Sequence, residues 1–289
     1  MLQLIQIIGL PFLACVIIGA MLGYLGIHVL KREVIFIDIA LAQIAAVGSI
    51  LAHLIFEAHD DSVLAYICSF CCVLLAAGFY AAVRKRIKQI SLEAVIGVSY
   101  AIAAGAALFL VGIAPGGHLH VQTMLSGSLL WATWQDIIVS MILFFMVGLG
   151  FLILRKPLGR ISENYQDAVA EGVKVVWWDF LFYTLLGVVI TFAVRIAGVV
   201  AVFALLIIPA TISAFLSSHW LMRMIIAWAA IVIASVAGLL FAYYLDFSVG
   251  PSVVLFLCCE LVITSLMARL KTLILGQKGQ ITLLSLIFK

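Results

Sequence analysis

The stretch WWDFLFYTLLGVVITFAVRIAGVVAVFALLIIPATISAFL, residues 177–216, decides the fold of this protein. It is interrupted by only a few polar side chains, of which Asp179 and Arg195 are charged. As one continuous helix it would be roughly 60 Å long at about 1.5 Å per residue. The hydrocarbon core of a bilayer is only about 30 Å thick. The stretch therefore predicts two membrane-spanning helices that fold back on each other, with the turn near Arg195 and Gly198.

The apolar composition continues on both sides of this stretch. Of 289 residues, 66% are hydrophobic and 10% are charged, and the mean hydropathy is +1.32. Soluble domains have about 45–50% apolar and about 25% charged residues. The composition excludes a water-soluble enzyme, a disordered chain and a nucleic-acid binder. It predicts an all-α fold, a polytopic transmembrane helical bundle that forms a single domain over residues 1–289.

Segments of about 20 apolar residues, the length of one helical span, recur along the chain. We expect about eight to nine spans from the following segments: 4–30, 34–56, 63–83, 94–114, 137–154, 177–194, 196–216, 224–245 and 247–268. A shorter segment, Val121–Trp134, follows Pro115-Gly116-Gly117 and is too short to cross. We expect it to be re-entrant or to lie at the membrane interface.

The positive charges predict the orientation of the chain. With the N-terminus outside, the inner loops and the C-terminal tail, about residues 269–289, contain every Lys and Arg except Arg195, out of 16 in total. Because positive residues favour cytoplasmic loops, we expect the N-terminus outside and the C-terminus in the cytoplasm. The outer loops then carry acidic and histidine side chains, as suits a protein that takes up cations.

Several motifs of other protein classes are missing. The chain has no G-x-x-x-x-G-K-[ST] loop, so we expect that it does not hydrolyse ATP and is not an enzyme. It also lacks H-E-x-x-H, G-x-S-x-G, an Arg-rich voltage-sensor helix and a TVGYG filter. With these classes excluded, the sequence indicates a carrier or the membrane subunit of a carrier.

Ionisable residues inside spans are costly and are therefore candidate functional residues. Asp38, Asp179 and Glu260 fall within predicted spans. Glu260 could line a substrate path, or it could be a protonated carboxyl bonded to a neighbouring helix. We expect Asp179, beside two tryptophans, to be an interfacial residue.

The second span combines polar side chains with many small ones. Asp38, Gln43 and His53 lie among alanines and Gly48, a pattern that indicates close helix contact or space for a substrate. His53 and Glu57 are four residues apart and share one face of a helix. With the histidines and acids of the outer loops they form a possible metal relay, although solvated loop polarity would produce the same pattern.

The longest polar segment lies in an inner loop, at about residues 160–176. Ser162 or Asn164 could cap a short helix that Gly172 would end. Such a helix on the cytoplasmic face could bind a partner protein, and it could also be a simple amphipathic linker.

Most of the chain resembles the permease subunit of the metal-ion (zinc, manganese, iron) ABC importer family. The similar segments are Pro11-Phe12, the second span, Glu93–Leu108 with Ile96-Gly97, Leu125–Leu130 with Gln135-Asp136, DAVAEGVKV at 167–175, LLIIPA at 205–210, and Asp246 with GPSVV at 250–254. One departure concerns the second span, where the family commonly has Asp-x-x-x-His. Here Asp38 is followed five residues later by Gln43, so Zn²⁺, Mn²⁺ and Fe²⁺ are not distinguished.

The resemblance implies a permease in the bacterial plasma membrane that binds no cofactor itself and transports a divalent metal cation. It implies a homodimer embedded in lipid, an ABC ATPase subunit that binds the ATP, and an extracytoplasmic solute-binding protein. The expected path or gate residues are Asp38, Gln43 and Asp246, with His53, Glu57 and Glu260 behind them. The expected ATPase contacts are Asp167, Ala168, Glu171 and Gly172. The alternatives are a permease for a metal chelate, such as a siderophore or haem, and an ATP-independent secondary carrier.

Overall fold

The computed structural model describes residues 2–56, 62–86, 89–113, 127, 129–163 and 165–287, and all regular elements within these ranges are helices. They are α1 (Leu2–Lys31), α2 (Ile37–Phe56), α3 (Val63–Arg86), α4 (Leu92–Ile113), the short 3-10 helix η1 (Leu129–Trp131), α6 (Trp134–Ile153), α7 (Arg155–Glu163), α8 (Tyr165–Ala170), α9 (Val175–Ala197), α10 (Val199–Leu216), α11 (Trp220–Leu245) and α12 (Val249–Ile287).

Within the described ranges, 9 helices are long and apolar enough to cross a membrane. These are α1 to α4, α6 and α9 to α12, while α7 and α8 are too short. Each of the predicted spans corresponds to one of these helices, so the all-α fold and the upper number of spans are confirmed.

The predicted turn between residues 177 and 216 is also confirmed. Helix α9 ends at Ala197 and α10 begins at Val199, with Gly198 between them. Gly198 has a φ of 83°, a backbone conformation that glycine adopts without steric cost. The Gly198 amide still donates to the carbonyl oxygen of Val194, which closes the last turn of α9.

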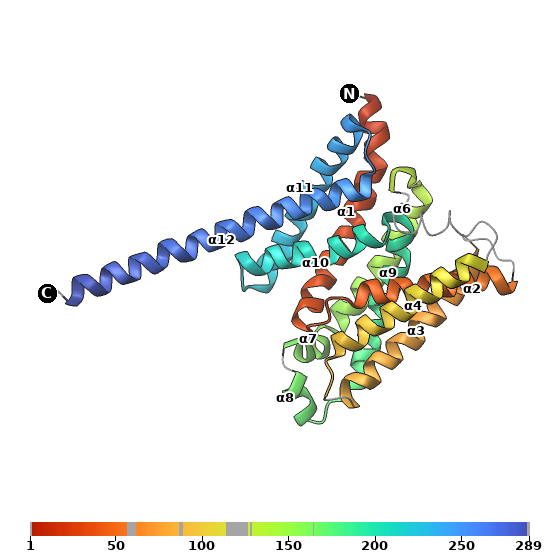
Figure 1. Cartoon of the computed structure of the whole chain (residues 1–289), viewed down its shortest axis with the longest axis horizontal. Coiled ribbons are helices and arrows are strands. Elements are labelled where there is room, and N and C mark those ends of the chain that lie inside the picture. The colour runs from red at the N-terminus through yellow and green to blue at the C-terminus, as the bar shows by residue number, and fades with distance from the viewer. Residues whose placement is uncertain are drawn as a thin grey trace.

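The helices pack in two groups that share one hydrophobic core (Figure 1). Helices α2, α3 and α4 pack together, and α9 packs against α3 and α2. Helices α10, α11 and α12 pack together, and α1 packs against α10 and α11. Helices α7 and α8 lie at one end of the bundle, and the N-terminus lies at the other (Figure 1).

Small residues of the second span mediate close helix contact. A Cβ atom added at Gly48 would lie 2.7 Å from the Ser69 Cα atom of α3, which leaves no room for it. Ala42, Ala45 and Ala46 are buried on the same helix. The stripe of small residues in α2 therefore includes a helix-packing face, the first of the two interpretations that the sequence allowed.

Two sequence expectations meet a different outcome, and a third concerns a segment that lies mostly outside the described residues. The last helix does not stop near residue 268, because α12 continues to Ile287 and projects away from the bundle (Figure 1). Ser162 lies inside α7 and is not a cap, while Asn164, the other candidate cap, lies outside the described residues. Of the short segment 121–134, residues 121–126 and 128 lie outside the described residues, and the remainder contains η1 and the first residue of α6.

Candidate functional site

Asp38 is the most unusual acid of the membrane-spanning helices. It lies in the first turn of α2 and is 1% exposed. Neither carboxylate oxygen has a hydrogen-bond partner among the described residues. The positive end of the α2 macrodipole favours negative charge at this position. A buried carboxylate without a partner is costly. Binding of a cation or a proton to the free oxygens of Asp38 would reduce this cost.

Gln43 and His53 lie further along α2 and are both half-buried. His53 is fifteen residues beyond Asp38, a rise of about 22 Å along a helix. Asp38 is therefore near the end of the bundle that carries α7 and α8, and His53 is near the opposite end. Glu57, the expected partner of His53, lies outside the described residues.

Asp246 and Glu260 lie on the other group of helices. Asp246 is exposed and caps the end of α11 with a φ of 57°, in the left-handed region. Glu260, in α12, is half-buried, and its Oε1 atom is buried without a partner. A single copy of the chain thus distributes the expected path residues over two helix groups. In the described ranges, no three His, Cys, Asp or Glu side chains are placed to hold a metal ion.

The polar segment predicted at about residues 160–176 contains the end of α7, all of α8 and the turn after it. We call α7, α8 and this turn the coupling segment, because they include the expected ATPase contacts. Asp167, Glu171 and Gly172 are exposed. Glu171 forms an ion pair with Arg160, with 2.9 Å between the carboxylate oxygen and the guanidinium nitrogen. Gly172 has a φ of 75° and follows α8, where it ends the helix as predicted. Ala168 differs from the other three because its side chain is fully buried in a small cluster with Ile161 and Val175.

The sequence interpretation missed two features of this region. Val169 exposes 41% of its surface on α8, next to the expected coupling residues. Its position in the DAVAEG segment was the available signal. Glu93, the first residue of the similar segment Glu93–Leu108, accepts hydrogen bonds from the backbone amides of Ile35 and Phe36 at 3.0 and 3.3 Å. It joins the start of α4 to the turn between α1 and α2.

The expectation for Asp179 was wrong. Asp179 is not an interfacial side chain but is 0% exposed, inside the bundle near the start of α9. Its Oδ1 atom accepts hydrogen bonds from Arg32 at 2.7 Å and from Arg84 at 3.1 Å. The reason is that α1 and α3 both end beside α9, and each brings an arginine that must be neutralised when it is buried.

Arg32 also contacts the coupling segment. Its Nε atom donates to the Ser162 hydroxyl at 2.9 Å, and its guanidinium lies 3.9 Å from the centre of the Phe182 ring. Burial lowers the pKa of Arg32 from its ordinary value, and the negative charge of Asp179 opposes this shift. Because an arginine pKa starts above about 12, Arg32 is a cation in this site.

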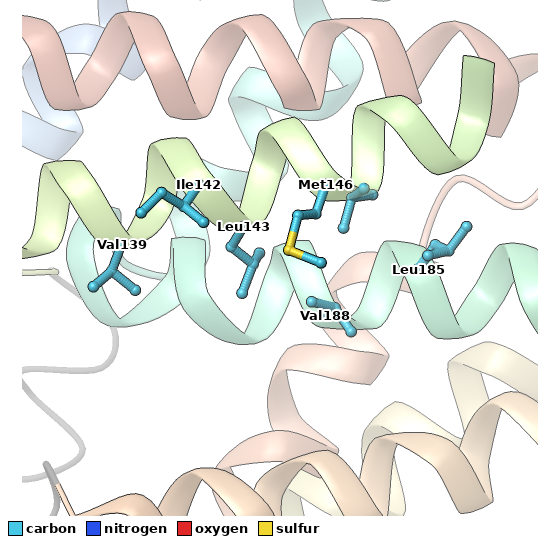
Figure 2. Close-up of a pocket in the computed structure, with 7 residues that line it drawn as sticks. Val139, Ile142, Leu143, Met146, Leu185 and Val188 are labelled. Carbon is cyan, nitrogen blue, oxygen red and sulfur yellow. The ribbon is translucent and has the colours of Figure 1, made fainter. Parts of the chain in front are cut away.

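Two hollows on the described part of the surface have linings without the expected path residues. A groove of about 550 Å³ between α6 and α9 is lined by seven apolar side chains, including Leu143, Met146 and Val188 (Figure 2). Such a lining suits lipid chains and offers no ligand for a cation. A second hollow of about 550 Å³, at the opposite end of the bundle from α7 and α8, is lined by Arg195, Asp136 and Tyr66 among others. The Arg195 guanidinium lies 3.7 Å from the centre of the Tyr66 ring.

These features define the chain as a polytopic helical membrane protein with a short helical segment exposed at one end of the bundle. The ABC 3 transport family matches residues 5–268, nearly the whole chain. The protein therefore belongs to the ABC 3 transport family, and the resemblance seen in the sequence is confirmed.

Known members and a solved structure are similar to this chain. The manganese transport system membrane protein MntC of Halalkalibacterium halodurans is 24% identical over 84% of this chain and 80% of its own length. The chelated iron transport system membrane protein YfeC of Yersinia pestis is 24% identical over 59% of this chain and 58% of its own length. PsaBC from Streptococcus pneumoniae, solved in complex with a Fab, has 21% identity and a TM-score of 0.73, covering 89% of this chain and 90% of that chain.

Proposed function

We propose that this protein is the permease subunit of an ATP-driven importer that moves a divalent metal cation across a bacterial plasma membrane. The observation that carries the proposal is the match to the ABC 3 transport family over residues 5–268, in a chain that has no nucleotide-binding loop of its own. ATP would bind to a separate ABC ATPase subunit. A solute-binding protein would deliver the cation, and two copies of the permease would form the path between them.

The distribution of charge supports an orientation with α7 and α8 in the cytoplasm. The alternation of the helices brings the ends of α1, α3 and α6 to the same side as α7 and α8. Lys31, Arg84 and Arg155 lie at these ends, as expected for cytoplasmic loops. The N-terminus would then be outside, and α12 would lead to a cytoplasmic C-terminus.

The path residues of the proposal are Asp38, Gln43 and Asp246, with His53, Glu57 and Glu260 behind them. Oxygen ligands such as those of Asp38 and Gln43 suit Mn²⁺ better than they suit Zn²⁺. Because one copy does not assemble these side chains within its described residues, the proposal requires residues of two copies, or a path in which the cation meets them in sequence. Weak and successive contacts also allow the ion to leave.

The surface for the ATPase subunit would be formed by α8 and the turn after it. Asp167, Glu171 and Gly172 are exposed there, beside the apolar side chain of Val169. Ala168 would support this surface from below, because its methyl group is buried. Charged side chains around one apolar contact are typical of a non-obligate protein interface.

The test is reconstitution of the permease with its ATPase subunit and binding protein in lipid vesicles, with uptake of Mn²⁺, Zn²⁺ and Fe²⁺ measured separately. The proposal predicts uptake that requires ATP and the binding protein, and no uptake by the permease alone. Robust ion flux from the permease alone would contradict it and would favour a secondary carrier.

A second candidate function is import of a metal chelate. The similarity to YfeC, a chelated iron transport system membrane protein, favours it. In the same vesicles, free Mn²⁺ and an iron chelate would be offered together. Preferential uptake of the chelate would select this second function, and preferential uptake of the free cation would select the first.

A further inference from the structure

The ion cluster of Arg32, Arg84 and Asp179 joins three helices at the end of the bundle that carries α7 and α8. Asp179 belongs to α9, Arg32 follows directly after α1, and Arg84 lies in the last turn of α3. Both arginines donate to the same oxygen, Oδ1 of Asp179. The Asp179 Oδ2 atom is buried and has no partner among the described residues. The two arginines therefore share one carboxylate oxygen, and this oxygen joins the ends of α1 and α3 to α9.

Each arginine of this cluster also contacts the coupling segment. Arg32 donates to the Ser162 hydroxyl of α7 at 2.9 Å and to the Leu158 carbonyl oxygen at 3.4 Å. The Arg84 guanidinium lies 4.2 Å from the centre of the Tyr165 ring of α8. Burial raises the pKa of the Tyr165 phenol, with the Asp179 charge adding to the shift, so the ring is neutral beside Arg84. Hydrogen bonds to a charged group and cation–π contacts are strong when they are shielded from water.

Other contacts of α7 and α8 include local bonds and apolar packing. The Ser162 hydroxyl donates to the Leu158 carbonyl oxygen within α7, and Arg160 forms an ion pair with Glu171. Apolar packing also attaches the segment, through the small cluster of Ile161, Ala168 and Val175 and through Leu158 of α7, which is buried in the main core. Apolar contacts are not directional, whereas the hydrogen bonds of Arg32 and the ring contact of Arg84 favour one orientation of the segment relative to α1, α3 and α9.

We propose that Arg32 and Arg84, held by Asp179, are positioning residues that transmit movement of the α7–α8 segment to α1, α3 and α9 during transport. The inference rests on the proposed function, because it assumes that an ATPase subunit moves the segment. A displacement of α7 pulls on Arg32 through Ser162, and a displacement of α8 pulls on Arg84 through Tyr165. Both forces meet at the Asp179 carboxylate, inside the bundle.

The experiment removes the contact of Arg32 with the Ser162 hydroxyl and the contact of Arg84 with the Tyr165 ring, and it leaves the buried ion cluster intact. The double variant Ser162→Ala and Tyr165→Leu removes the acceptor for Arg32 Nε and the ring beside Arg84, and it keeps all three charges. The matched control is Ser162→Ala with Tyr165→Phe, which restores the ring. Loss of the Tyr165 hydroxyl should itself have no effect, because this buried hydroxyl has no partner among the described residues.

Each variant is assembled with the ATPase subunit and the binding protein in vesicles, and Mn²⁺ uptake per ATP hydrolysed is measured together with thermal stability. We expect the leucine double variant to co-purify with the ATPase and to hydrolyse ATP, with a ratio of Mn²⁺ to ATP about 3- to 30-fold below wild type. The phenylalanine control restores the ring beside Arg84 but not the Ser162 acceptor, so it should recover part of the ratio. A purely structural role would instead lower thermal stability and leave the ratio of the surviving complexes unchanged.

Two results would overturn the inference. One is a leucine double variant with the wild-type ratio of Mn²⁺ to ATP. The other is equal loss in the leucine variant and the phenylalanine control, because the ring would then be irrelevant. Failure of the proposed function is distinguishable from both, since the wild-type permease would then not associate with an ATPase at all.

Discussion

Two buried aspartates near the base of the bundle, Asp38 and Asp179, show how differently a membrane protein can treat the same side chain. Asp38 is 1% exposed and has no partner for either oxygen among the described residues, while Asp179 is 0% exposed and accepts hydrogen bonds from two arginines. Asp179 therefore contributes to the architecture, since it compensates two buried cations. Asp38 has no hydrogen-bond partner among the described residues, and this is why we propose it as a path residue.

The contrast between Asp38 and Asp179 also separates two parts of the proposed mechanism, contact with the cation and transmission of movement. The Asp38 region offers vacant oxygen acceptors, which suit transient contact with a cation. In the Asp179 region, the Oδ1 atom already accepts hydrogen bonds from two arginines, and these arginines would repel a cation. Ion translocation and mechanical transmission would thus be assigned to separate carboxylates.

The largest expected effect is on Asp179. The substitution Asp179→Ala leaves two arginine cations without a counter-ion in the bundle, and breaking such a pair costs about 3–5 kcal/mol. We expect the variant to lose most of its folded population, measured as the peak that survives heating on size-exclusion chromatography in detergent. Asp38→Ala is the control, because it removes no partnered charge. Equal stability of the two variants would contradict the assigned difference between a paired and an unpaired aspartate.

The next effect concerns transport through Asp38. The substitution Asp38→Asn keeps the shape of the side chain and removes its charge, so it should leave thermal stability unchanged or higher. Uptake of Mn²⁺ by the reconstituted importer should fall by about tenfold, which corresponds to about 1.4 kcal/mol in the transport barrier. Wild-type uptake by this variant would remove Asp38 from the path. Asp38→Glu, which retains the charge, tests whether the charge or the exact position matters.

A smaller effect is expected at the turn of the coupling segment. Gly172 has a φ of 75° and open space around its Cα atom, so Gly172→Ala is opposed by the backbone alone, by about 1 kcal/mol. Stimulation of the ATPase by the binding protein should decrease with it. Gly159→Ala is the matched control, since Gly159 is helical and also has open space. There the substitution should stabilise α7 by up to about 1 kcal/mol. Effects of the same sign at both glycines would contradict the assigned role of the turn.

The smallest effect should come from the exposed ion pair of the same segment. Arg160 and Glu171 are joined at 2.9 Å, but their side chains are 63% and 51% exposed. We expect Arg160→Gln to change thermal stability by less than about 0.5 kcal/mol, whereas Arg32→Gln should resemble the Asp179 variant. Measured side by side, these two arginine substitutions test whether burial, and not charge alone, decides the cost.

Much of the candidate site followed from the sequence because it depends on local properties. Asp38 lies in a span because apolar residues surround it on the chain, and Gly172 ends a helix because of its own backbone freedom. Glu171 and Asp167 are exposed because the segment around them is polar. Asp179 was misinterpreted for the same reason. Its neighbours Trp177 and Trp178 suggest an interface, and the arginines that bury it are 147 and 95 positions away in the chain.

The amino-acid sequence by itself determined the spans, the turn at Gly198 and the short coupling helix, because the length of an apolar run and the conformational preference of a glycine act over a few residues. Membership of a transport family also followed from the sequence, because its motifs are contiguous. Only the tertiary structure decided which carboxylate is paired and which is left open. Pairing depends on where α1, α3 and α9 converge, and that convergence results from packing along their whole length.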